Sequence, residues 1–408
     1  MCLRIIQFPL ISLIFITILA GCASYPAKMA QVKHDFVYGD YEAALAGIDG
    51  DDCRSGGDML LWLLERATIK QNMGDFEGSN RDFEAAYRVI KDYEDRPDVS
   101  LRDAGSEVGA ALVNETTLPY KGLGYEKMLL HIYKALNYLM LGDMEGSRVE
   151  LRRLEERRKI EKEAHVAAIK DAEESAEEEN LEKSEISGIE QQLRDAYGSA
   201  RKVAARVKDL YLSAFGSYLS SIHYDMEGDF SEALIDDRRI ISQVPSFVSA
   251  RRDAYSLGAD DIAAPPADID LKERGDLVIF FQCGLSPVKR EVYIPIPTSR
   301  GWLSAAFAVY ETVPTDLEAA RVYLNGEKVG ETEIVSDVEA KQIRSLIDMI
   351  PVTVIRQLIR ITIKAVALNV ASKEAGSGGE LVMSLYNIFS EQADLRSWLL
   401  LHKNIQAL

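Results

Sequence analysis

The side chains that most often do chemistry are not arranged for catalysis in this sequence. Cys53 and Cys283 lack CxxC spacing, so they indicate neither a metal site nor a redox dithiol, and they could pair or remain two free thiols. Gly376-Ser377-Gly378-Gly379 is not followed by the Lys-Ser or Lys-Thr of a phosphate-binding loop. The five histidines show no HExxH motif and no short ligand spacing: His34, His131, His165, His223 and His402. The sequence therefore predicts no enzyme, no metal and no cofactor.

One helical stretch carries a row of cations. Arg356, Arg360 and Lys364 follow Pro351 at four-residue spacing, on a helix that is otherwise apolar nearly all round. One interpretation is a core helix whose solvent-facing stripe is basic. The other is a docking site for an anion, which would be a lipid head group, a cell-wall glycopeptide or an acidic partner.

The overall charge excludes some partners. The 408 residues include 65 acidic and 47 basic ones, which gives a net charge of −18. This balance argues against binding to nucleic acid and against broad electrostatic adhesion to anionic lipid. The length allows two or three domains, and 47% hydrophobic residues are ordinary for a globular protein.

The N-terminus supplies a different kind of chemistry. A nearly uninterrupted apolar run from Ile5 to Ala20 follows Arg4, which predicts a signal peptide over residues 1–21. Leu19-Ala20-Gly21-Cys22 resembles the lipobox of bacterial lipoproteins. The resemblance implies cleavage before Cys22, a diacylglycerol on its thiol and an acyl chain such as palmitate on its amino group, which together anchor a protein durably. The alternative is an ordinary secretory signal with a chance cysteine.

Two further expectations follow from this N-terminus. Ala23 and Ser24 follow the cysteine, and the absence of Asp at the second mature position resembles lipoproteins sorted to the outer membrane. We therefore expect a location in the cell envelope, on the outer membrane and facing the periplasm. The covalent lipid on Cys22 is the only attached group expected, and cleavage would remove the charge of Arg4 and leave a net charge of −19, from −18.

A recurring turn motif indicates the helices that would position any site. A Gly-Asp pair followed by an apolar residue and small residues occurs four times, at Gly39-Asp40, Gly74-Asp75, Gly142-Asp143 and Gly228-Asp229. The first two glycines are 35 residues apart and the next gap is 68, twice the 34-residue period of tetratricopeptide-type repeats. Gly can end one helix and Asp can cap the next. We therefore predict helical repeats over residues 31–257, after a lipidated tether at 22–30.

An insertion interrupts the repeat. The gap from Gly142 to Gly228 is 86 residues, 52 more than one 34-residue period. Residues 145–211 are rich in charge and recover helical periodicity from Ile186, which predicts a charged helical hairpin. It could be a solvated arm or a coiled-coil arm for a partner or for self-association. If the protein has a distinctive interaction surface, we expect it at the base of this arm.

The second half changes character after a linker at residues 258–270, which contains Pro265-Pro266. Alternating segments and an Asn325-Gly326 turn predict strands, and helical segments follow from residue 337. The predicted fold is mostly α, with tetratricopeptide-like (TPR-like) helical repeats, an inserted charged helical hairpin, and then a small α+β domain over residues 271–408. The segment from Ser397 to Leu408 could supply a last strand.

Four segments carry a resemblance to a known family: Tyr133–Leu139, Arg148–Arg153, Gly284–Lys289 and Ala393–Trp398. They resemble a family of uncharacterised bacterial outer-membrane lipoproteins with a tetratricopeptide-like half and a small α+β C-terminal domain. The resemblance brings no catalytic residue. It implies a scaffold or adaptor in envelope assembly or secretion whose repeat groove binds protein partners, among them other envelope lipoproteins. The alternatives are an envelope-binding module that uses the basic stripe, and a hydrolase of unrecognised type.

Overall fold

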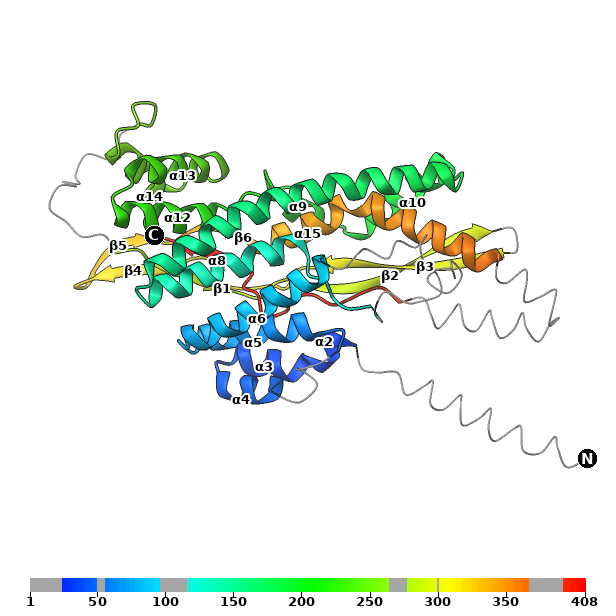
Figure 1. Cartoon of the computed structure of the whole chain (residues 1–408), viewed down its shortest axis with the longest axis horizontal. Coiled ribbons are helices and arrows are strands. Elements are labelled where there is room, and N and C mark those ends of the chain that lie inside the picture. Colours follow the sequence, from blue (N-terminus) through cyan, green and yellow to red (C-terminus); the bar gives the residue numbers. More distant parts are fainter. Residues whose placement is uncertain are drawn as a thin grey trace, which may run out of the picture.

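The N-terminal half of the protein is a series of helix pairs (Figure 1). The structure is a computed structural model that describes residues 24–49, 56–95, 116, 118–263, 277–298, 301–366 and 392–408. A short helix α2 (Tyr25–Lys28) precedes the first pair and α14 (Val248–Ser256) follows the last. The pairs are α3 (Ala30–Val37) with α4 (Tyr41–Ile48), α5 (Met59–Asn72) with α6 (Phe76–Glu94), α8 (Gly124–Met140) with α9 (Met144–Glu178), and α12 (Ala214–Glu227) with α13 (Phe230–Gln243).

The Gly-Asp turns join the two helices of every pair. Each glycine has a positive φ, between +74° and +80°, which L side chains rarely adopt. Each aspartate donates its backbone N–H to the carbonyl five residues earlier, and its carboxylate accepts the N–H three residues later. One aspartate therefore closes the first helix and caps the second. The residues are Gly39 and Asp40, Gly74 and Asp75, Gly142 and Asp143, and Gly228 and Asp229.

Small residues let the paired helices approach each other. A Cβ at Gly146 of α9 would lie 2.6 Å from the ring of Tyr138 on α8, so only glycine fits there. In the second pair Leu64 and Ala67 of α5 are buried with Phe83 and Ala86 of α6. The helical spacing of these apolar residues gives each helix one buried face.

The charged insertion folds as a helical hairpin but does not protrude freely. Helix α9 continues to Glu178, and α10 (Lys183–Ala196) and α11 (Ala200–Ala204) follow. Ile189 and Leu193 of α10 are buried against Ile294 and Phe307 of the ribbon formed by β2 (Val288–Thr298) and β3 (Gly301–Glu311). The expectation of a solvated arm is therefore wrong for α10, because its apolar stripe packs on this ribbon.

Three small antiparallel sheets and two helices form the rest of the described fold. The order in the three-stranded sheet is β1 (Phe280–Cys283), β7 (Asn404–Ala407) and β6 (Glu333–Asp337), so the last strand of the chain is central. The other sheets pair β2 with β3, and β4 (Arg321–Leu324) with β5 (Glu327–Glu331) across Asn325-Gly326, both at positive φ. Helix α15 (Val338–Asp348) and a helix over 350–366 follow β6. The predicted fold class is confirmed.

The two predicted domains share one hydrophobic core. Val335, Trp398 and Ile405 from beyond the predicted linker are buried in the same cluster as residues of α5, α6, α8 and α12. A boundary at 258–270 therefore does not separate two cores, and residues 264–276 lie outside the described residues. The tether predicted at 22–30 is also shorter, because Tyr25 and Met29 are buried in this core. Residues 1–21, Cys22, Cys53 and the helix expected near 381–389 lie outside the described residues as well.

Candidate functional site

The C-terminal strap, residues 392–403, has no regular secondary structure and lies among the helices of the repeats. It is drawn in red in Figure 1, where it runs beside α6 and α8. It comes just before β7, so it connects the central strand of the sheet to the repeat core. The contacts of the strap show how this repeat surface recognises a peptide backbone.

Two buried carboxylates bind three consecutive backbone N–H groups of the strap. Glu65 of α5 accepts the N–H of Leu399 at 2.6 Å and that of Leu400 at 2.9 Å. Glu126 of α8 accepts the N–H of Trp398 at 2.9 Å. Such N–H groups need partners when they are buried, and here the helices supply them in place of a β-sheet ladder.

The indole of Trp398 anchors the strap. Its side chain is 0% exposed, and its Nε1 donates to Thr68 Oγ1 at 2.9 Å. The ring centroids of Phe83 and Tyr133 each lie 5.8 Å from that of the indole, in tilted and edge-on orientations. The ring thus fills an aromatic pocket between α5, α6 and α8 and satisfies its one donor.

Cationic side chains fix the beginning of the strap. Arg396 Nη1 donates to Asp58 Oδ1 at 3.1 Å and to the carbonyl of Leu118 at 2.9 Å, and its guanidinium lies over the Tyr120 ring. Lys289 of β2 donates to the carbonyl of Arg396 at 2.7 Å. These contacts join the strap to the loops before α5 and α8 and to the β2–β3 ribbon.

Burial raises the pKa of Glu65 to about 8, although the bonds from Leu399, Leu400 and the Tyr25 hydroxyl act in the opposite direction. Below that pH the carboxyl carries a proton, so the core holds no isolated charge at this point. Both oxygens of the Glu65 side chain accept backbone N–H groups of the strap, and these bonds are what oppose the effect of burial on its pKa.

It follows that the repeat surface between α5, α6 and α8 is occupied by the protein's own chain. The expectation that the generic repeat groove binds a partner does not hold for this surface. The sequence analysis did not predict that the strap occupies this surface. Glu65, within the Leu-rich run of α5, could have indicated it, because a carboxylate on an apolar helix face needs hydrogen-bond donors from another segment.

A second depression, the open groove, lies between α6 and the turn that follows α8. It has a volume of about 700 Å³ and is lined by both helices and by Asp143 of the Gly142 turn. This volume is in the range of ligand-binding clefts. The groove is at the base of the inserted hairpin, where the sequence led us to expect an interaction surface.

The lining of the open groove is polar and carries both charges. Arg88 pairs with Glu84 at 3.4 Å, whereas Arg81 forms no ion pair with any residue that the structure describes. Leu141 adds an exposed apolar side chain. Mixed charge beside exposed apolar area is typical of surfaces that bind proteins transiently.

Asn80, which lines the open groove, belongs to a row of buried polar side chains between α5, α6 and α8. Gln71 donates to Asn137 Oδ1 at 2.6 Å, and Asn137 donates to Ser79 at 2.9 Å and to Asn80 Oδ1 at 3.0 Å. Asn80 Nδ2, buried and within the lining, has no hydrogen-bond partner. This donor is an unsatisfied polar group beneath the surface of the groove, and it costs free energy in the folded protein.

A buried ionic network stiffens the helices behind the groove. Glu150 of α9 contacts His131 at 2.7 Å, Lys134 at 2.8 Å and Arg153 at 2.8 Å, and Lys134 also contacts Glu84 at 2.7 Å. Burial alone would raise the pKa of Glu150, but these partners lower it to about 2. The network joins α6, α8 and α9, so the groove walls are held in fixed positions.

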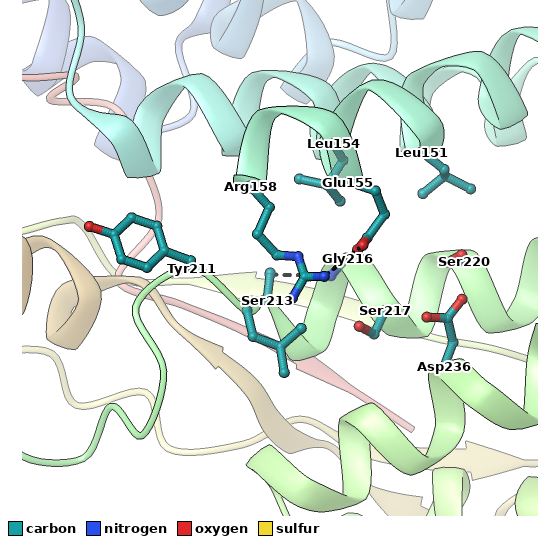
Figure 2. Close-up of a pocket in the computed structure, with 11 residues that line it drawn as sticks. Leu151, Leu154, Glu155, Arg158, Tyr211, Ser213, Gly216, Ser217, Ser220 and Asp236 are labelled. Atoms are coloured by element: carbon teal, nitrogen blue, oxygen red, sulfur yellow. Dashed lines mark hydrogen bonds and ion pairs between the residues drawn. The ribbon is translucent and has the colours of Figure 1, made fainter. Parts of the chain in front are cut away.

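A smaller pocket lies between α9 and α12, and Figure 2 shows its lining. Its volume is about 20 Å³, which is room for about one water molecule. Arg158 donates to Glu155 at 2.9 Å on its α9 side. A pocket of this size holds no substrate, so the open groove remains the better candidate.

The predicted basic stripe is not one exposed surface. Arg356 is exposed, but Arg360 and Lys364 are buried and each has an interaction partner. One side of this helix packs on the β2–β3 ribbon through Val354 and the other packs on α9 through Ile355. The expectation of an anion-docking stripe formed by these three residues is therefore wrong.

The remaining candidate chemistry is sparse. Within the described residues no group of three or more His, Cys, Asp and Glu side chains could hold a metal ion. Cys283 is a buried free thiol that contacts Asn404 Oδ1 at 3.1 Å. None of the helices in the described part of the chain is both long and apolar enough to cross a membrane.

Comparisons with known proteins give little further information. No protein-family model matches the chain, and a search of curated proteins gave no match. Among solved structures, the TPR2AB-domain:pHSP90 complex of yeast Sti1 aligns with 14% sequence identity over 56% of this chain and 81% of that chain, with a TM-score of 0.23. At this TM-score the likeness supports no inference about function.

Proposed function

We propose that this protein is a non-enzymatic scaffold of the bacterial cell envelope, anchored by lipid on Cys22 to the outer membrane and facing the periplasm. Its open groove binds a segment of a protein partner, which we expect among the envelope lipoproteins. The lipobox-like Leu19-Ala20-Gly21-Cys22 supports the anchor. The open groove, with the volume of a binding cleft and the exposed side chains of Arg81, Arg88 and Leu141 in its lining, is the observation that carries the binding function.

The choice of the open groove follows from the occupancy of the other repeat surface. A partner between α5, α6 and α8 would have to displace Trp398, which is fully buried. A partner in the open groove displaces no described segment and meets Arg81, Arg88 and Leu141 directly. The alternative of an envelope-binding module loses its premise, because two of the three residues of the basic stripe are buried.

Site-specific cross-linking in native membranes tests this function. A photo-reactive residue at Ala85, which lines the open groove, should give one discrete cross-linked species. The charge reversal Arg81→Glu should remove that species, while Arg238→Glu on α13, outside the groove lining and with its side chain 52% exposed, should leave it unchanged. Cross-linking that persists in the Arg81→Glu protein would show that the groove is not the site.

A second measurement tests the anchor separately. The Cys22→Ala protein should leave the membrane fraction, because the thiol that accepts the lipid is gone. If that variant still sedimented with membranes, the lipid anchor would be refuted while the groove hypothesis would stand.

A further inference from the structure

The folded body begins almost at the proposed lipid anchor. Tyr25 is 4% exposed, its ring lies 5.7 Å from that of Trp62, and its hydroxyl donates to Glu65 at 3.2 Å. Met29 is fully buried in the same core. The chain is thus fixed to the repeat domain three residues after Cys22.

This short connection limits how far the body can be from the bilayer. An extended chain spans at most about 3.6 Å per residue, so Cys22 lies within about 11 Å of Tyr25. A lipid on Cys22 has its acyl chains in the hydrocarbon layer, which places the backbone of Cys22 at the head groups. The part of the protein around α2 and α3 must therefore lie at the membrane surface.

The outward side of α2 and α3 has the composition that such a position requires. The exposed residues between 24 and 38 include no carboxylate, although the chain has a net charge of −18. The one carboxylate in this segment, Asp35, has its side chain 18% exposed and contacts Gln31 and His34 of the same surface. The exposed residues are Ser24, Ala27, Lys28, Ala30, Gln31, His34, Val37 and Tyr38.

Aromatic and apolar side chains end this stripe. Val37 is 55% and Tyr38 is 77% exposed, and the centroid of the Tyr38 ring lies 4.6 Å from that of His34 in a tilted orientation. Tyrosine is favoured where a membrane meets water, because its ring is apolar and its hydroxyl is polar. With a single, largely covered carboxylate, Asp35, and the exposed cation Lys28, residues 24–38 meet little repulsion from anionic lipid.

We propose that the outward side of α2 and α3, residues 27–38, lies against the head-group layer of the bilayer. This inference rests on the proposed lipid anchor at Cys22. In Figure 1 the blue α2–α4 region lies on the lower side of the molecule and the α9–α10 hairpin runs along the upper side, so the hairpin lies on the side away from α2 and α3. Partners then approach the protein from the periplasmic side.

Depth-dependent quenching of a single fluorophore tests the proposal. The lipidated full chain is reconstituted in vesicles of phosphatidylethanolamine and phosphatidylglycerol that contain a head-group nitroxide lipid. The label is placed at Ala30→Cys in one protein and at Val166→Cys, 61% exposed on α9, in a matched control. Both carry Cys53→Ser, and Cys283 is buried.

The two readouts separate the proposal from its premise. Co-sedimentation with vesicles reports the anchor, and a protein that does not sediment would refute the proposed anchoring. For protein that does sediment, the label at residue 30 should be quenched severalfold more than the label at residue 166. Equal quenching at the two positions would overturn the membrane-facing assignment.

A substitution on the same surface gives an independent check. Tyr38→Glu should lower the quenching at residue 30, because a carboxylate there is repelled by phosphatidylglycerol. The side chain of Tyr38 is largely exposed, so the fold should be unchanged, which thermal unfolding would verify. Unchanged quenching in a folded Tyr38→Glu protein would overturn the contact.

Discussion

Replacing Trp398 by alanine should destabilise the whole repeat core. The indole is fully buried and packs against Phe83 and Tyr133, and the loss of a buried tryptophan costs about 3–5 kcal/mol in free energy of unfolding. The lost bond to Thr68 adds little, because the Thr68 hydroxyl still donates to the carbonyl of Leu64 at 2.9 Å and loses only an incoming donor. The cavity term therefore dominates.

Denaturant unfolding followed by circular dichroism measures this loss. A matched control is Trp302→Ala on the β2–β3 ribbon, where the side chain is 71% exposed and the change should stay within about 0.5 kcal/mol. Both variants lose a tryptophan side chain, one buried and one exposed. The difference between their changes in free energy of unfolding therefore reports the contribution of the buried environment of Trp398.

One result would refute the reasoning. If Trp398→Ala cost less than about 1 kcal/mol, as surface substitutions do, the strap would not be part of the folded core in solution. The surface between α5, α6 and α8 would then be open to a partner, and the preference for the open groove would lose its basis.

Two further predictions concern the turns and the buried acid. Gly142→Ala should lower the free energy of unfolding by about 1–2 kcal/mol, because a Cβ there meets no neighbour and only the left-handed backbone at φ +74° is strained. Gly188→Ala within α10, also without neighbours, should instead raise it by about 0.5–1 kcal/mol. Equal effects of the two substitutions would contradict this account. For Glu65 the pKa is raised from 4.5 to about 8, so the unfolded chain loses the proton first and stability falls as pH rises through that window. The free energy of unfolding of the native protein should therefore fall relative to Glu65→Gln between those pH values, and a pH-independent difference would show that Glu65 is ionised in the fold.

Local chemistry made the repeats predictable from the sequence. The Gly-Asp turn needs a glycine that adopts positive φ and an aspartate whose carboxylate accepts the N–H three residues later, at the start of the next helix. Both residues can be recognised within a few positions of the sequence. The Asn325-Gly326 hairpin is local in the same way. Elements of this kind can be predicted because no distant partner decides them.

Distant partners decided what the sequence did not reveal. Trp398 and Thr68 are 330 positions apart, and nothing near Trp398 indicates the pocket that it enters. The helix over 350–366 shows a different error. Its helical periodicity was predicted correctly from the sequence, but the row of Arg356, Arg360 and Lys364 was expected to face solvent. The β2–β3 ribbon and α9 cover two faces of that helix, and Arg360 and Lys364 are buried on a further face. Periodicity finds a helix, whereas the exposure of each face depends on what packs against it.

The free-energy cost of displacing the strap also determines which repeat surface a partner can use. A partner that entered between α5, α6 and α8 would first have to expose Trp398, at a cost of about 3–5 kcal/mol. Each 1.4 kcal/mol lowers affinity about tenfold, so this competition would weaken binding by about two to three and a half orders of magnitude. The open groove imposes no such cost, because no described segment occupies it. Under the proposed function, the strap fills the surface between α5, α6 and α8, and the open groove is the surface left for a partner.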